Sequence, residues 1–199
     1  DDLQWLIANG GTAASIAPGR AVNGEALLAG WRADREQLLA AASVIDPSAR
    51  VPWYGPAMAA RSFVTARLME TWAHGQDVAD AVGVQRPPTA RLRHVAHIGV
   101  RARPFSYLVN GKPLPEQSVY VALTAPDGSV WEWGEPAADR VTGPALDFCL
   151  VITQRRHVAD TRLVVEGEAA REWIEIGQAF AGEAGTGRAA GQFPALTES

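Results

Sequence analysis

The segment ETWAHGQD, residues 70–77, holds three side chains whose types could do chemistry: Glu70, His74 and Asp77. On an α-helix, residues four apart are offset by about 40° and residues seven apart by about 20°, so these side chains share one narrow stripe. A carboxylate and a neutral imidazole at this spacing can form a surface ion pair, or both can bind one metal ion such as zinc. The spacing alone leaves both interpretations open, because helices contain many Glu/His pairs.

Few other side chains offer comparable chemistry. His94 and His97 lie three apart on a later helical segment, where they could share a face or simply decorate an arginine-rich surface. The single cysteine, Cys149, rules out an intrachain disulfide framework and a cysteine-based metal cage, and its apolar neighbours predict a buried small hydrophobe. No G-x-S-x-G elbow, phosphate loop or dinucleotide fingerprint occurs.

Helices are predicted for most of the first half of the chain. The stripe falls in a proline-free segment, residues 57–82, that ends before Gly83. Two further amphipathic helices are predicted over 24–45, after the N-cap residue Asn23, and over 89–102, before Pro104. Residues 1–23 are expected to be irregular.

The pattern changes from helical to alternating after the proline-containing segment 110–117. A β-hairpin is predicted over 118–134, a helix over 142–156 with Thr142 as N-cap, a strand over 161–167 and a last helix over 168–182. We therefore expect a helical domain, residues 1–109, and an α/β domain, residues 110–199, with a mobile tail from about residue 182.

Composition excludes several classes of protein. The 22 acidic and 18 basic side chains give a net charge of −4 without a basic block, which argues against a nucleic-acid partner. No apolar stretch approaches the ~20 residues of a membrane span, and the first residues lack the layout of a signal peptide. We expect a cytoplasmic monomer or homodimer with no membrane partner.

Two sets of motifs resemble known families. The pattern Arg67-x-x-Glu70-x-x-x-His74-x-x-Asp77 resembles the metal-binding helix of the DinB-like superfamily, and in particular the mycothiol-dependent maleylpyruvate isomerases and related mycothiol S-transferases. RVTGPALDFCLVITQRR (140–156) is similar to the Gly-Pro-Ala helix in the sterol-carrier-like domain of those isomerases. VALTAPDGSVWEWG (121–134) and ALDFCLVITQRRHVADT (145–161) resemble an uncharacterised actinobacterial group with a wyosine-base-formation-type C-terminal domain.

The resemblance covers about residues 24–182 and implies an α+β fold. This fold is a DinB-like helical bundle, whose first helix is missing, followed by a small sterol-carrier-like α/β domain. It further implies that Glu70 and His74 bind zinc or another divalent metal. Because no histidine precedes His74, the third ligand would be a histidine on the missing helix, His94 or His97 would substitute for it, or the site would have only two of its usual ligands. We therefore expect the chain to be a fragment.

The same resemblance implies a function. An external thiol, mycothiol, would serve as nucleophile, Arg155 would pair with a substrate carboxylate, and Asp77 would bind the thiol or orient the imidazole. The expected activity is a metal-dependent thiol transferase or isomerase that acts on a small electrophilic carboxylate. A non-catalytic metal-binding or carrier domain and a zinc-dependent hydrolase remain alternatives, since a zinc-bound water would use the same open position.

Overall fold

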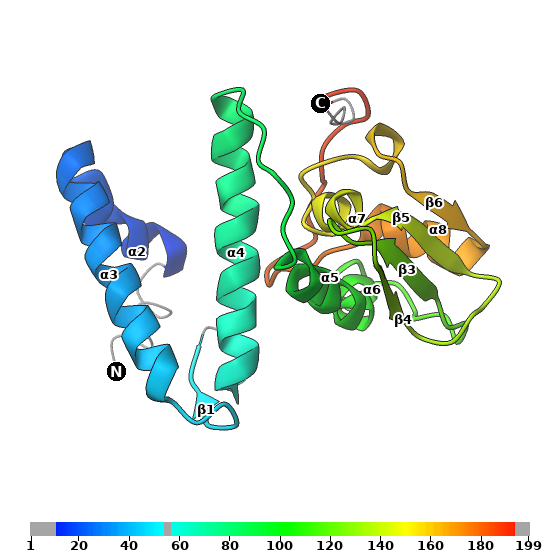
Figure 1. The fold of residues 1–199 in the computed structure, drawn as a ribbon, viewed down its shortest axis with the longest axis horizontal. Coiled ribbons are helices and arrows are strands. Elements are labelled where there is room, and N and C mark those ends of the chain that lie inside the picture. Colours follow the sequence, from blue (N-terminus) through cyan, green and yellow to red (C-terminus); the bar gives the residue numbers. More distant parts are fainter. Residues whose placement is uncertain (1–10, 54–56, 194–199) are drawn as a thin grey trace. The chain divides into compact units, whose positions relative to one another are not determined.

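The computed structural model describes residues 11–53 and 57–193 and has an α+β fold with an N-terminal helical region and a small sheet near the C-terminus (Figure 1). The chain divides into two compact units, residues 1–64 and residues 65–199. Helix α4 (Ala60–Ala81) begins in the first unit and continues into the second. The domain boundary predicted at 109/110 falls inside the second unit, where helices from both sides of it share one core.

Before α4, the described residues of the first unit form helices α2 (Gly11–Arg20) and α3 (Gly24–Val44) and a short antiparallel ribbon of β1 (Arg50–Val51) and β2 (Met58–Ala59). The helix predicted after Asn23 is confirmed, because the Asn23 side chain accepts a hydrogen bond from the Ala26 amide at 2.8 Å. The prediction that residues 1–23 are irregular is wrong for residues 11–20, where alanines favour a helix despite Pro18. Residues 1–10 and 54–56 lie outside the described part of the chain.

The second unit continues α4 and adds two short helices, α5 (Leu92–Arg101) and α6 (Arg103–Val109). The predicted helix over 57–82 is confirmed as α4. The predicted effect of Pro104 is also confirmed, because α5 ends before Ala102. Pro104 then occupies the first turn of α6, where a missing N–H costs no hydrogen bond.

A four-stranded sheet follows, with the strand order β4-β3-β5-β6. Its strands are β3 (Tyr120–Thr124), β4 (Val130–Trp133), β5 (Arg140–Pro144) and β6 (Val164–Glu166). The predicted hairpin is confirmed as the antiparallel pair β3–β4, whose turn uses Gly128 at a positive φ of 83°. Strand β5 runs parallel to β3 and antiparallel to β6.

The predicted start of the helix at Thr142 is wrong. Residues 140–144 form β5, in which Thr142 pairs with Ala122, and α7 (Ala145–Ile152) begins only after Pro144. Tertiary strand pairing therefore outweighs the local capping signal. Helix α7 also ends four residues early, since Gln154 has a φ of 62°. A 3₁₀ turn (Val158–Asp160) and α8 (Glu168–Ile176) complete the elements, and α8 ends before the predicted residue 182.

Helices α5, α7 and α8 pack with one face of the sheet to form the core of the second unit. Gly99 of α5 allows a close approach to α7, because a Cβ at this position would lie 2.8 Å from the side chain of Ile152. Phe148 meets Trp173 edge to face with ring centroids 6.0 Å apart. Cys149 is fully buried, as predicted, and burial raises the pKa of its thiol. Among the described residues, no helix is long and apolar enough to cross a membrane.

Candidate functional site

The three polar residues of α4 lie side by side on one stripe. His74 Nε2 is 3.4 Å from Glu70 Oε2, and His74 Nδ1 is 3.3 Å from Asp77 Oδ2. The imidazole therefore has a carboxylate on each ring nitrogen. Its side chain is 69% exposed, whereas those of Glu70 and Asp77 are about one third exposed at 30% and 33%, so a ligand could reach this stripe from solvent.

Arg155, which follows α7 in the chain, reaches the same stripe. Its guanidinium holds Asp77 with two hydrogen bonds, Nε to Oδ1 at 3.2 Å and Nη2 to Oδ2 at 2.8 Å. Nη1 donates to the Thr153 carbonyl at 2.6 Å, and Nη2 lies 3.4 Å from His74 Nδ1. The structure thus places four residues that the sequence analysis names next to one another, although the segments that carry them lie nearly 80 positions apart. They are Glu70, His74, Asp77 and Arg155.

The charges around Asp77 favour its ionised form. Burial raises the pKa of this carboxyl group, but the hydrogen bonds and positive charge of Arg155, aided by His74, outweigh burial and place the pKa below the usual aspartate value. Asp77 is therefore a carboxylate at neutral pH. A carboxylate beside Nδ1 favours a proton on that nitrogen, and in the neutral ring with this tautomer the Nε2 lone pair is available to a metal ion.

A second acidic residue of α4 pairs with the next arginine. Asp80 accepts two hydrogen bonds from Arg156, at 2.7 and 2.8 Å, and a third from the Gln76 amide at 2.9 Å. The two charged side chains are only 11% and 3% exposed. The hydrogen bonds from Arg156 lower the pKa of Asp80, against an opposing effect of burial. The sequence analysis missed this pair, although two aspartates three apart and two consecutive arginines are a usable signal.

The segment after α8 also reaches the stripe. Arg188 Nη2 lies 3.5 Å from Asp77 Oδ1, and the Phe193 ring lies near the guanidinium groups of both Arg156 and Arg188, at 4.7 and 5.3 Å. The Gly191 amide donates to both carboxylate oxygens of Asp160 at 2.8 and 2.9 Å. Composition predicts a mobile tail from about residue 182, and this stays a prediction; in the structure Arg188 of this segment contacts Asp77.

Neither histidine of α5 joins the stripe. His94 and His97 are exposed, and His97 Nδ1 accepts a hydrogen bond from Trp133 Nε1 at 3.2 Å. Within residues 11–53 and 57–193, no group of three or more His, Cys, Asp and Glu side chains is arranged to hold a metal ion.

Glu70 and His74 nevertheless fit two positions of a zinc site. Zinc binds nitrogen and oxygen at about 2.0–2.2 Å, so two ligands of one tetrahedral ion lie about 3.3–3.5 Å apart. The 3.4 Å separation of Glu70 Oε2 and His74 Nε2 matches this edge. Asp77 on the other ring nitrogen is the outer carboxylate that commonly orients a metal-binding histidine.

Comparisons with known proteins find two relatives of this chain in one organism. The chain is 48% identical over 169 residues to two proteins of Mycobacterium tuberculosis, Uncharacterized protein MT0041 (strain CDC 1551 / Oshkosh) and Uncharacterized protein Rv0036c (strain ATCC 25618 / H37Rv). Each match covers 84% of this chain and 66% of the relative, so the chain spans slightly less than two thirds of the length of these proteins. No solved structure matches the chain.

A protein-family model matches the N-terminal part of the chain. Residues 4–79 match the model described as the mycothiol maleylpyruvate isomerase N-terminal domain, and the matched range includes Glu70, His74 and Asp77. The match ends before α5, so the resemblances stated for the C-terminal half stay predictions. Over residues 4–79 the chain is therefore similar to the mycothiol maleylpyruvate isomerase N-terminal domain family, a DinB-like family.

Proposed function

We propose that the protein is a metal-dependent, cytoplasmic thiol transferase or isomerase that uses mycothiol on a small electrophilic carboxylate. The observation that carries this proposal is the position of the His74 ring between Glu70, at 3.4 Å, and Asp77, at 3.3 Å. The family match over residues 4–79 supports it, because the family description names a mycothiol maleylpyruvate isomerase.

Glu70 and His74 would hold the divalent metal, most simply zinc. The proton on His74 would sit on Nδ1 and be donated to Asp77, which leaves the Nε2 lone pair free for the metal. A third ligand would come from outside the described residues, since no three-residue group is present within them. When bound, such a metal lowers the pKa of a coordinated thiol, so that thiolate forms at neutral pH.

Asp77 and Arg155 would then orient and stabilise the reacting groups. Arg155 fixes the Asp77 carboxylate with two hydrogen bonds, and Asp77 in turn fixes the orientation of the imidazole. The guanidinium has five N–H donors, of which Asp77 and Thr153 accept three. The remaining donors could bind a substrate carboxylate or an oxygen that gains negative charge during thiol addition.

The reaction itself needs no cysteine from the protein. The external thiolate would add to a double bond conjugated with carbonyl groups. In an isomerase, rotation about the resulting single bond and expulsion of the thiolate would give the isomer, and in a transferase the thiol would stay attached. Cys149 is unsuitable as the nucleophile, because it is fully buried and burial raises its pKa.

A thiol titration tests the choice of reaction. The cobalt-substituted protein would be titrated with mycothiol and with glutathione while its visible spectrum is recorded. Mycothiol is expected to change the spectrum at lower concentration than glutathione. If neither thiol changes the spectrum, and the zinc protein cleaves ester or amide substrates, the thiol chemistry is contradicted and a hydrolase takes its place.

Arg155→Ala separates charge stabilisation from metal binding. We expect the variant to keep its metal and to lose about 10²-fold in turnover, because the change removes a cation and leaves the two metal ligands in place. Metal content and steady-state rates measured on the same preparation check this. Loss of the metal together with turnover would show that Arg155 acts by holding the site together rather than on the substrate.

A further inference from the structure

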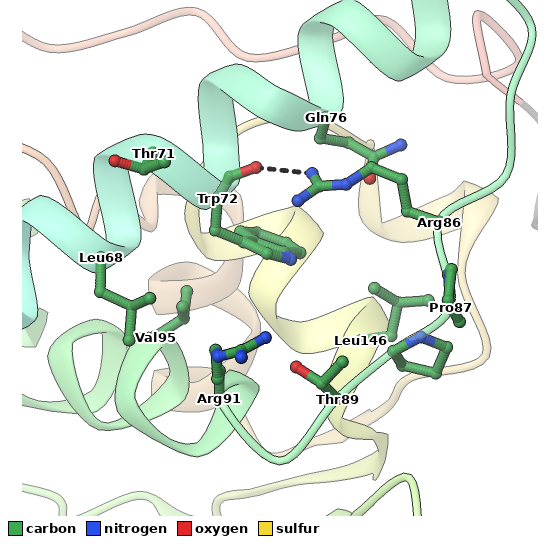
Figure 2. Close-up of a pocket in the computed structure, with 11 residues that line it drawn as sticks. Leu68, Thr71, Trp72, Gln76, Arg86, Pro87, Thr89, Arg91, Val95 and Leu146 are labelled. Carbon is green, nitrogen blue, oxygen red and sulfur yellow. Dashed lines mark hydrogen bonds between the residues drawn. The ribbon is translucent and has the colours of Figure 1, made fainter. Parts of the chain in front are cut away.

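A pocket of about 310 Å³ lies on another face of α4, entirely within the second unit (Figure 2). Its lining residues come from α4, from the loop after it, from α5 and from α7: Leu68, Thr71, Trp72, Gln76, Arg86, Pro87, Pro88, Thr89, Arg91, Val95 and Leu146. This volume lies at the small end of the range found for ligand pockets in proteins. None of these residues belongs to the Glu70–His74–Asp77–Arg155 site, so the pocket goes beyond the proposed function.

The pocket and the polar stripe use roughly opposite sides of the same helix. Each residue turns an α-helix by about 100°, which places Leu68 and Trp72 on the side away from Glu70 and His74. A ligand in the pocket would therefore not contact the proposed metal ligands directly. The pocket is a separate candidate binding site.

The walls of the pocket are mostly apolar and include one large aromatic ring. The Trp72 indole projects from α4 toward the middle of the pocket, with Val95 and Leu146 from the neighbouring helices around it (Figure 2). Pro87 and Pro88 also line the pocket. A flat indole face in an apolar setting favours a planar, aromatic ligand that can stack on it.

The charged groups of the pocket are all positive. Its lining includes Arg86 and Arg91 but no aspartate, glutamate or lysine. Arg86 is held in place, because its Nη1 donates to the Trp72 carbonyl at 2.8 Å. The guanidinium also lies over Gly75, where a Cβ would come within 3.1 Å of it. The lining therefore carries two positive charges, Arg86 and Arg91, and no negative charge. Such a pocket favours an anionic ligand.

Arg91 is the cation that remains available to a ligand. It precedes α5 and is exposed, and within residues 11–53 and 57–193 its guanidinium has no hydrogen-bond or ion-pair partner. In Figure 2 it lies on the other side of the Trp72 ring from Arg86. A guanidinium of this kind can bind a carboxylate with two parallel hydrogen bonds.

We propose that this pocket binds a small aromatic carboxylate, with the ring against Trp72 and the carboxylate on Arg91. The apolar walls bind the ring, and the net positive lining selects the acid over a neutral analogue of the same shape. The ligand class follows from these two features together.

Calorimetric titration with 2-naphthoate and with 2-naphthamide tests the proposal. The two compounds share the ring and differ in charge, so naphthoate is expected to bind at least about tenfold more tightly if a charge-assisted hydrogen bond is made. Arg91→Gln should remove most of this preference. Arg93→Gln is the matched control, because Arg93 is exposed two residues further along, in α5, but does not line the pocket.

Trp72→Leu gives a second, independent readout. This variant should weaken the binding of both compounds, because both lose the stacking surface, whereas Arg91→Gln should weaken only the acid. Circular dichroism confirms that each variant is folded. The proposal is overturned if naphthoate does not bind, if the acid and the amide bind equally, or if Arg93→Gln weakens binding as much as Arg91→Gln.

Discussion

Two aspartates three residues apart on α4 each pair with one of two consecutive arginines, yet their surroundings differ. Asp80 and Arg156 form a buried pair with side chains 11% and 3% exposed. Asp77 and Arg155 form a more open pair, in which Asp77 is 33% exposed and also contacts His74 and Arg188. The same residue types therefore serve two purposes: the buried pair fixes the end of α7 against α4, and the open pair presents groups to solvent.

The difference shows how a helix can carry a stable anchor and a reactive site next to each other. Removing one partner of a buried ion pair is strongly destabilising, because the other charge is left buried and unpaired, whereas a pair near the surface contributes little to stability. The anchor holds the loop from which Arg155 extends, so Asp80 and Arg156 position the site without belonging to it.

The largest expected effect is on stability. Asp80→Asn should lower the free energy of unfolding by about 3–5 kcal/mol, because Arg156 would be left as an unpaired buried charge. Asp77→Asn should lower it by about 1 kcal/mol or less, because the group is partly exposed. Urea denaturation of both variants checks the comparison. Equal losses in the two variants would contradict the division into anchor and site.

The next largest effect is on metal affinity. Here Asp77→Asn, and not Asp80→Asn, should have the larger effect. Asp77→Asn should weaken metal affinity about 10–100-fold, because the His74 ring loses the carboxylate that orients it. Asp80→Asn, measured at a temperature where it stays folded, should bind metal within a few-fold of the unchanged protein. A competition titration with a zinc indicator gives both constants, and an unchanged affinity in Asp77→Asn would exclude an orienting role for this residue.

The smallest expected effect is on how the stability of the protein depends on pH in acid. The hydrogen bonds from Arg156 lower the pKa of Asp80 in the folded protein, so the unfolded state binds more protons as the pH falls. The stabilising contribution of this group is therefore complete above the unfolded value of about 3.9 and is lost as the pH falls through the lower folded value. Denaturation at pH 5, 4 and 3 should show a flatter dependence for Asp80→Asn than for the unchanged protein.

Local periodicity was sufficient to predict part of this site. The stripe of Glu70, His74 and Asp77 depends only on the helical repeat and on the absence of proline, and α4 confirms that helix. The position of Arg155 could not be derived in this way, since its contact with Asp77 joins residues 78 apart in the chain. Only the family resemblance suggested that Arg155 comes near the stripe.

Features that depend on tertiary pairing were predicted poorly. Thr142 and Pro144 are typical of a helix start, but their backbone pairs with β3 in the sheet. The Asp80–Arg156 pair and the pocket around Trp72 likewise join residues from separate elements. Spacing along one helix carries no information about which loop will pack against it.

The central claim, that Glu70 and His74 hold a metal ion, is tested most directly by metal analysis. The unchanged protein and His74→Ala would each be reconstituted with zinc, passed through a desalting column and analysed for bound metal. We expect about one zinc ion per chain in the unchanged protein and little in His74→Ala, with both proteins folded by circular dichroism. No zinc in the unchanged protein, or equal zinc in both, would contradict the claim and leave Glu70 and His74 as an ordinary helix pair.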